Sequence, residues 1–279
     1  MNNKIITMSD ICGFSWYLEH EEKSYATVEK YRRDVIAFWK VVGNEPLTKE
    51  AVMIYKKILI EKNYAVTSIN SMLASVNAFL EYLNLREFKV KHIRTQHQTY
   101  CSEDKELYKD EYLRLLEASK KNEQLNLVIQ TICGTGIRVS ELQFFTVEAV
   151  QCGKIVVACK NKTRTILVPG KLRKLLLSYA KRKHITKGMI FITCKGAPLN
   201  RSNIWLAMKK LCEAAKVKAT KVFPHNLRKL FARTFYGMEK DIAKLADVLG
   251  HSSINTTRIY IMTTGAEHLR KIERLGLVI

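Results

Sequence analysis

Long apolar runs and export signals are missing from this sequence. No stretch approaches the roughly 18 consecutive apolar residues that a membrane-spanning helix needs. The N-terminal segment, MNNKIITMSDICGFSWYLEHEE, brackets a short apolar piece with acids and has no small-residue cleavage site. These absences predict a soluble, cytoplasmic protein with no membrane partner.

Metal-binding patterns are missing too. The chain has seven cysteines, an odd number, and none of them belongs to a Cys-x-x-Cys pair. It also has no His-x-x-x-His pattern and no stretch of clustered Cys and His. We therefore expect reduced thiols, no metal site and no cofactor.

Acidic residues are scarce in the second part of the chain. Residues 1–100 carry 14 Lys and Arg against 11 Asp and Glu, whereas residues 101–279 carry 33 against 15. Between Lys154 and Arg233 there are 21 basic residues and one acid, Glu213. Such a run would repel itself, so it favours a polyanionic partner, with nucleic acid ahead of an anionic membrane surface. A two-magnesium nuclease or transposase is disfavoured, because its site needs a carboxylate cluster.

The first part of the chain has the pattern of helices. Four segments place apolar residues at helical spacing: about 10–20, 27–43, 47–62 and 66–85. Ser9 or Asp10 is expected to cap the first helix, Gly43 to end the second and Thr48 to cap the third. Their aromatic residues are expected in a core, so residues 1–90 are predicted to form a compact helical domain.

The second part mixes two periodicities. Residues 91–103 read as a basic linker, and KIVVACK followed by RTILVP predicts a β-hairpin at 154–169, with a further strand at 189–193. Helices are expected at about 107–118, 123–133, 137–147, 171–183, 201–215, 225–237, 241–249, 254–262 and 265–275. The expected fold is mainly α with a small antiparallel β-sheet, divided into a helical domain (1–90) and a mixed α/β domain (104–279).

Four short stretches combine residue types that can act on a phosphodiester: TGIRVSEL (135–142), VVACKNKTR (156–164), PHNLRKLFART (224–234) and LGHSSINTTRIYI (249–261). Through them the whole chain resembles the tyrosine recombinases of the integrase type. Catalytic domains of that family carry a TGLRxSEL-like stretch, a hairpin lysine, an HxLRHxFA-like helix and an LGHxxxxxTxxxY ending. One such motif is a weak signal, but four in this order are a strong one.

The resemblance assigns six catalytic positions, which are Arg138, Lys160, His225, Arg228, His251 and Tyr260. They match, in turn, the first family arginine, the hairpin lysine, the HxxR pair, the LGH histidine and the tyrosine nucleophile. The separations fit as well, with 22 residues from Arg138 to Lys160 and nine from His251 to Tyr260. Each residue alone has an ordinary structural explanation, and only the combination favours catalysis.

The chemistry of these residue types agrees with the resemblance. Two guanidiniums can each donate paired hydrogen bonds to the equatorial oxygens of a phosphodiester under attack. A tyrosine hydroxyl, with an ordinary pKa of about 10, needs nearby cations or an imidazole to attack at neutral pH. A lysine at a hairpin tip can protonate the departing 5′ oxygen. No metal is required, because side chains supply the positive charge.

Two departures from the family pattern stand out. The family hairpin reads GKGNKER, whereas this chain has CKNKTR, so Cys159 precedes Lys160 and one glycine is missing. The general acid is therefore either Lys160 or a neighbouring basic residue, Lys162 or Arg164. The family's HxLRH becomes HNLRK, with Lys229 at a position outside the expected catalytic set.

Further DNA contacts are expected from Lys162, Arg164, Arg201, Asn203 and Lys209. The resemblance places the helix that begins near residue 201 in the major groove, where Arg201 and Asn203 can read base edges. Lys209 is expected to contact phosphates or solvent.

The resemblance implies site-specific recombination of double-stranded DNA through a 3′-phosphotyrosine and a Holliday junction. It implies a homotetramer on two DNA sites in the bacterial cytoplasm or nucleoid, with room for accessory DNA-bending or directionality proteins. The amphipathic tail 265–279 is expected to dock on a neighbouring subunit. Because the helical unit begins near residue 9, we expect no arm-binding domain before it.

The biological process stays open between alternatives. Integration, excision or transposition of a mobile element is slightly favoured by the altered hairpin. A Xer-like resolvase of replicon dimers and a catalytically silent DNA-binding regulator of the same fold are the other two. A serine recombinase or a type IB topoisomerase fits the motifs less well.

Overall fold

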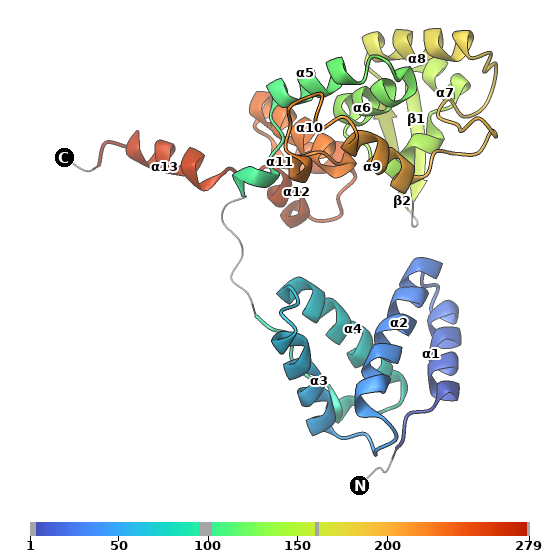
Figure 1. The fold of residues 1–279 in the computed structure, drawn as a ribbon, viewed down its shortest axis with the longest axis vertical. Helices are drawn as coiled ribbons and strands as arrows, with labels where there is room; N and C mark the ends of the chain where they lie inside the picture. Colours follow the sequence, from blue (N-terminus) through green and yellow to red (C-terminus); the bar gives the residue numbers. More distant parts are fainter. Residues whose placement is uncertain (1–3, 95–101, 160–161, 278–279) are drawn as a thin grey trace. The chain divides into compact units, whose positions relative to one another are not determined.

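A computed structural model describes residues 4–94, 102–159 and 162–277 (Figure 1). The chain forms two compact units, Met1–His97 and Gln98–Ile279, here called unit 1 and unit 2. Within the described ranges, no helix is both long enough and apolar enough to span a membrane.

The described residues of unit 1 form four α-helices: α1 (Met8–His20), α2 (Tyr25–Val42), α3 (Lys49–Glu61) and α4 (Val66–Tyr82). Their apolar stripes meet in one core, in which Phe14, Phe38 and Phe79 are fully buried. Phe14 and Phe79 lie edge to face with ring centroids 5.2 Å apart, a favourable aromatic geometry. A short 3-10 helix, η1 (Arg86–Phe88), follows α4.

The caps of unit 1 largely follow the sequence. Gly43 ends α2 with φ of +68°, and the side chain of Thr48 caps α3 by accepting from the Ala51 N–H. The expected cap of α1 was wrong: Thr7 is the N-cap, not Ser9 or Asp10. Thr7 and Asp10 form a reciprocal capping box, since each side chain accepts from the other's backbone N–H.

Unit 2 holds the remaining elements. These are η2 (Glu103–Lys105), α5 (Lys109–Ala118), α6 (Glu123–Thr135), η3 (Val139–Phe144), α7 (Val147–Cys152), β1 (Lys154–Cys159), β2 (Lys162–Leu167), α8 (Gly170–Arg182), α9 (Arg201–Lys209), η4 (Ala219–Lys221), α10 (Pro224–Glu239), α11 (Ile242–Leu249), α12 (Ile254–Tyr260) and α13 (Gly265–Glu273). The predicted hairpin is confirmed: β1 and β2 pair antiparallel, with Lys154 opposite Leu167 and Cys159 opposite Lys162. The mainly helical fold with one small antiparallel sheet is also confirmed.

Three predicted elements of unit 2 differ from the structure. Residues 137–147 form no single helix, because Phe145 leaves helical geometry between η3 and α7 and Thr146 caps α7. The predicted strand 189–193 makes only isolated bridges, and its partner at Ile192 is Pro198, which has no N–H to extend a ladder. The predicted helix 201–215 ends at Lys209 and continues as tight turns, in which Leu211 and Cys212 each donate three residues back.

Two helix ends set the position of the site described below. Helices α6 and α10 pack against each other in unit 2, and α11 and α12 pack beside α10 (Figure 1). Helix α6 ends at Gly136 (φ +65°) and α11 ends at Gly250 (φ +64°), both left-handed conformations that favour glycine. The chain turns sharply at each of these glycines. Arg138 lies two residues after Gly136, and His251 lies one residue after Gly250.

Candidate active site

Side chains from four separate elements meet at one pocket of unit 2. Its volume is about 640 Å³, and its polar lining includes Arg138, Arg201, His225, Arg228 and Tyr260. The other walls are mostly apolar and come from Ile137, Val139, Trp205, Leu206, Phe223 and Pro224. The structure therefore brings together residues that lie more than 120 positions apart in the sequence.

Arg228 is the buried floor of this site. It lies one turn into α10, which begins at Pro224, and the residue is only 1% exposed. Its guanidinium donates to the main-chain carbonyls of Gly136 and Leu249 and to His251 Nε2, the last two at 2.7 and 2.9 Å. Its Nε has no hydrogen-bond partner among the described residues. Burial lowers the pKa of Arg228 to about 10, so it stays charged at pH 7.

The contacts of His251 define its tautomer. A guanidinium can only donate, so Nε2 of His251 accepts from Arg228 and the ring proton is on Nδ1. Nδ1 then donates to the hydroxyl oxygen of Thr257, 2.9 Å away on α12. Thr257 is fully buried. This chain of contacts ties the Gly250 turn to the helix that carries Tyr260.

Tyr260 is the last residue of α12 and is 8% exposed. Its ring packs in a small cluster with Ala232, Leu245 and Leu249. The rings of His225 and His251 each meet it edge to face, with centroids 4.9 and 4.8 Å away. The phenol thus lies between two imidazoles and beside the Arg228 guanidinium, which is 5.8 Å from the ring centroid.

Both imidazoles are neutral at pH 7. Desolvation by the surrounding side chains, then the charges of Lys229, Arg228, Arg201 and Arg138, lower the pKa of His225 to about 4. Burial, then Arg228, Arg138 and Arg164, lowers the pKa of His251 to about 4. Neutral imidazoles can accept a proton, and a bound phosphate would offset the positive charges that keep these two neutral.

Glu141 supports two arginines at once. It is 1% exposed, and its carboxylate accepts from Nη1 of Arg138 at 3.1 Å and from Nη2 of Arg164. It also accepts from the backbone N–H of Arg138 at 2.7 Å. Arg138 keeps 44% of its side chain exposed, and its remaining contact with the Gly250 carbonyl is long, at 3.3 Å. Glu141 therefore holds one side of the Arg138 guanidinium, and the exposed part of the side chain lines the pocket.

Arg164, a predicted DNA contact, makes two contacts within the protein. Its side chain is only 13% exposed and donates to Glu141 and, at 2.7 Å, to the Val248 carbonyl. The structure therefore uses Arg164 as a brace between β2 and the end of α11, which leaves its guanidinium engaged within the protein. An added Cβ on Gly250 would lie 2.5 Å from Cδ of Arg164, so the brace also covers this glycine.

Gly250→Ala is expected to damage both stability and the site. Positive φ alone costs an alanine about 1–2 kcal/mol, and displacement of Arg164 adds an overpacking cost of about 1–3 kcal/mol. Gly188→Ala is the matched control, because Gly188 also has positive φ (+76°) but open space within 4 Å of the added Cβ. Chemical denaturation should show the larger loss for Gly250→Ala. Equal losses for the two variants would contradict the bracing role of Arg164.

The other predicted DNA contacts divide into two groups. Arg201 and Asn203 are exposed in the first turn of α9, and Arg201 also lines the pocket. Lys209 instead donates to the Ala219 carbonyl and lies over the Trp205 ring, 5.2 Å from its centroid. Lys160 lies outside the described residues, and for Lys162 only its place at the start of β2 is described.

Three residues of the site, Glu141, Thr257 and Trp205, are not among those predicted from the sequence. Glu141 follows Arg138 by three residues, which is the spacing of a capping box, so a local signal for it existed. Thr257 and Trp205 had no local signal, because only the folded chain shows that one touches His251 and the other lines the pocket. Within the described ranges, no group of three or more His, Cys, Asp or Glu could hold a metal ion.

Comparisons with known proteins cover nearly all of the chain. Residues 105–267 match the phage integrase family, and residues 11–87 match the phage integrase N-terminal SAM-like domain. Tyrosine recombinase XerA of Pyrococcus furiosus is 28% identical over 287 aligned residues, which span 100% of this chain and 98% of the relative.

Solved structures show the same fold. The crystal structure of XerA recombinase is 26% identical with a TM-score of 0.54, over 97% of this chain and 99% of that one. Lambda integrase, solved as a dimer bound to a COC′ core site, has a TM-score of 0.72 at 17% identity, over 93% of this chain and 96% of that one. The lambda integrase tetramer bound to a Holliday junction has a TM-score of 0.70 at 17% identity, over 92% of this chain and 78% of that one. With a match that spans more than half of its length, the chain belongs to the phage integrase family.

Proposed function

We propose that the protein is a site-specific DNA recombinase in which Tyr260 attacks a DNA phosphate. The observation that carries this proposal is that Arg138, His225, Arg228 and Tyr260 line one pocket, and that the ring of His251 also contacts Tyr260. A tyrosine that served only packing would not need two imidazoles and two guanidiniums beside it. The family relation supports the same chemistry.

In the first step, the phosphate binds between the two arginines. Arg138 offers its exposed edge, and Arg228 offers a charge that is already desolvated and fixed by main-chain carbonyls. Fixed cations in a site shielded from water stabilise the charge that develops on the equatorial oxygens. Because both guanidiniums are held before DNA arrives, little reorganisation is needed during the reaction.

In the second step, a bond forms between Oη of Tyr260 and phosphorus, and the bond from phosphorus to the 5′ oxygen breaks. The phenolic proton passes to the neutral imidazole of His225, whose ring contacts Tyr260, because both nitrogens of His251 are already engaged by Arg228 and Thr257. The 5′ oxygen leaves as a hydroxyl after protonation by Lys160, which remains the proposed acid. The product is a 3′-phosphotyrosine that keeps the energy of the broken bond.

Strand exchange then reverses this step with a 5′-hydroxyl from a second DNA site. We propose double-stranded DNA as the substrate and a homotetramer on two sites as the working form. The lambda integrase tetramer on a Holliday junction supports this assembly for a protein of the same fold. Helix α13 leaves Leu269 and Ile272 about half exposed, which suits the docking of this tail on a neighbouring subunit.

The process that this chemistry serves has two candidates. Integration, excision or transposition of a mobile element is slightly favoured by the altered hairpin sequence. Resolution of replicon dimers is favoured by a relative named XerA, which aligns over the whole chain. Sequencing the cellular DNA that becomes attached to the protein would separate them: one chromosomal site favours dimer resolution, and the ends of an element favour mobility.

A nicked duplex substrate tests the proposed chemistry. Cleavage next to the nick releases a short strand that diffuses away, so the covalent intermediate accumulates. We expect a protein–DNA adduct that forms in the presence of EDTA, with the DNA attached to the peptide that contains Tyr260. DNA binding without any adduct would instead favour a catalytically silent regulator.

A further inference from the structure

Helix α8 carries a row of cations on its outer face. Lys171, Lys174, Lys181 and Arg182 are all exposed, and here they are called the α8 ridge. The opposite face of the helix is buried and carries Leu172, Leu176, Tyr179 and Ala180. With 3.6 residues per turn, the four cations therefore project together, away from the core.

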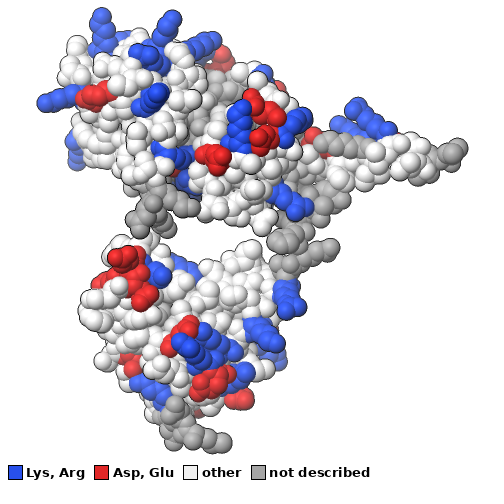
Figure 2. All heavy atoms as spheres, turned by 180° about the vertical axis from the view of Figure 1, so that it is seen from behind, with Lys and Arg blue, Asp and Glu red and all other residues white. Residues whose placement is uncertain are grey.

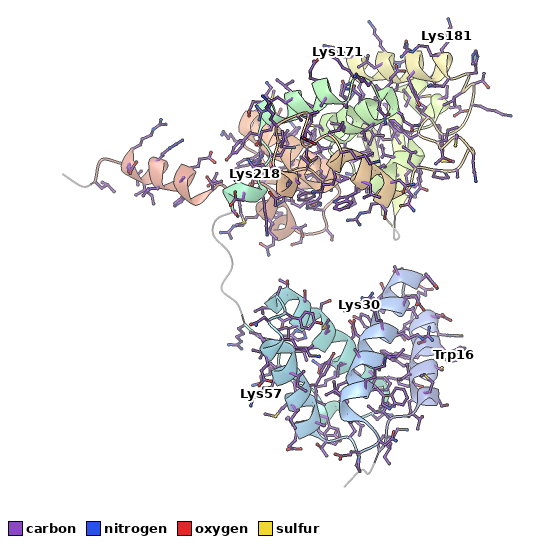
Figure 3. All side chains as sticks on the ribbon, viewed as in Figure 1. Trp16, Lys30, Lys57, Lys171, Lys181 and Lys218 are labelled. Carbon is purple, nitrogen blue, oxygen red and sulfur yellow. The ribbon has the colours of Figure 1, made fainter. Side chains whose placement is uncertain are left out.

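None of the ridge residues lines the candidate active site. Figure 1 shows α8 at one end of this unit, with α9 and α12 at the other. The side chains of Lys171 and Lys181 point outward, away from the rest of the unit (Figure 3).

The ridge keeps most of its charge. Arg182 pairs with Glu123, whereas the three ridge lysines form no ion pair within the described part of the chain. Two more exposed lysines, Lys183 and Lys187, follow α8. The segment from Lys154 to Cys212 contains no acid at all, and Figure 2 shows Lys and Arg gathered at this end of unit 2.

We propose that the α8 ridge binds the phosphate backbone of a second DNA duplex, separate from the one at the candidate active site. Lys171 and Lys181 are ten residues apart on a helix, which is about 15 Å at 1.5 Å per residue. Phosphates along one strand advance about 3.4 Å each, so the row spans several of them. Lysine point charges on a convex helix suit backbone contact without sequence readout.

The surface fits DNA better than a protein partner. Interfaces between proteins place apolar or aromatic anchors at their centre and lysine at the periphery. Among the described residues of α8, Leu175 is the only exposed large apolar side chain, at 37%. A polyanion therefore remains the partner that the ridge residues can hold.

Lysine footprinting on the full-length protein tests the proposal directly. A 30-base-pair duplex of arbitrary sequence is added in excess at low salt, and acetylation of each lysine is followed by mass spectrometry. We expect Lys171, Lys174 and Lys181 to be protected by the duplex and to become reactive again as salt is raised. Unchanged reactivity of all three would overturn the proposal, as would protection by polyglutamate or by anionic vesicles but not by DNA.

A capture experiment measures whether the protein can hold two duplexes at once. Protein on bead-bound duplex is asked to retain a second, labelled duplex. The triple change Lys171→Gln, Lys174→Gln and Lys181→Gln should lower this capture about tenfold, with a salt dependence shallower by about 0.9 per lost phosphate contact. The matched control changes Lys109, Lys216 and Lys240, three exposed lysines of unit 2 outside α8, to Gln.

Both triple variants should bind the bead DNA and form the Tyr260 adduct as the wild type does. Equal loss of capture in the ridge and control variants would overturn the ridge as a site. The proposal does not rest on the chemistry of Tyr260, because footprinting and capture need no cleavage. A protein that failed to form an adduct could still show ridge protection, so the two proposals fail separately.

Discussion

Tyr260→Phe is expected to abolish adduct formation and strand cleavage while leaving the fold intact. The ring of Tyr260 packs against Ala232, Leu245 and Leu249, and phenylalanine keeps these contacts. The ring contacts with His225 and His251 do not involve the hydroxyl, so they also remain. Loss of the nucleophile should lower cleavage by at least about four orders of magnitude, or roughly 5 kcal/mol in activation free energy.

Tyr236→Phe provides the matched control for this change. Tyr236 packs against the same cluster but does not line the pocket. Adduct yield on the nicked substrate, DNA binding by anisotropy and the melting temperature should be measured for both variants. Only Tyr260→Phe should lose the adduct, and both should bind DNA and melt close to the wild type. An adduct formed by Tyr260→Phe at the wild-type rate would assign the chemistry to another residue.

Arg228→Lys is expected to lower both stability and cleavage strongly. The guanidinium reaches Gly136, Leu249 and His251 together, and an ammonium group cannot keep this planar, forked geometry. A buried carbonyl left without its charged donor costs about 1–3 kcal/mol of unfolding free energy. Loss of a fixed donor at the developing charge should reduce cleavage by about 10²–10³-fold.

Arg233→Lys separates these two effects. Arg233 is another partly buried arginine of α10, and it pairs with Glu106 and donates to the Leu107 carbonyl, outside the pocket. It should lose stability without losing the cleavage rate per folded molecule. Denaturation curves and single-turnover cleavage, each scaled to the folded fraction, distinguish the variants. Equal rates for the two folded variants would remove Arg228 from the proposed phosphate site.

Local features of this fold could be predicted because neighbouring residues encode them. Pro224 at the start of α10, Asp241 as the cap of α11 and Gly250 at its end follow from backbone and capping rules. The hairpin of β1 and β2 follows from its β-rich runs and short connection. The family resemblance assigns Arg138 and Tyr260, and both line one pocket.

Contacts between distant parts of the chain could not be predicted in this way. Arg164 is a predicted DNA contact because it lies close to the hairpin lysine, and its guanidinium also donates to the Val248 carbonyl, 84 residues away. Its burial depends on the small size of Gly250, which no pattern around residue 164 reveals. The break at Phe145 is similar, since the burial of that ring and the cap by Thr146 override helical periodicity.

The way in which Arg228 is anchored has a consequence for how the sequence can vary. Two of its three acceptors are main-chain oxygens, at Gly136 after α6 and at Leu249, the last residue of α11. A backbone carbonyl is present whatever side chain stands there, so this anchorage survives substitutions that preserve the helix ends. The anchoring of Arg228 therefore depends on the positions of two chain turns. Substitutions of the surrounding side chains can leave its guanidinium in place.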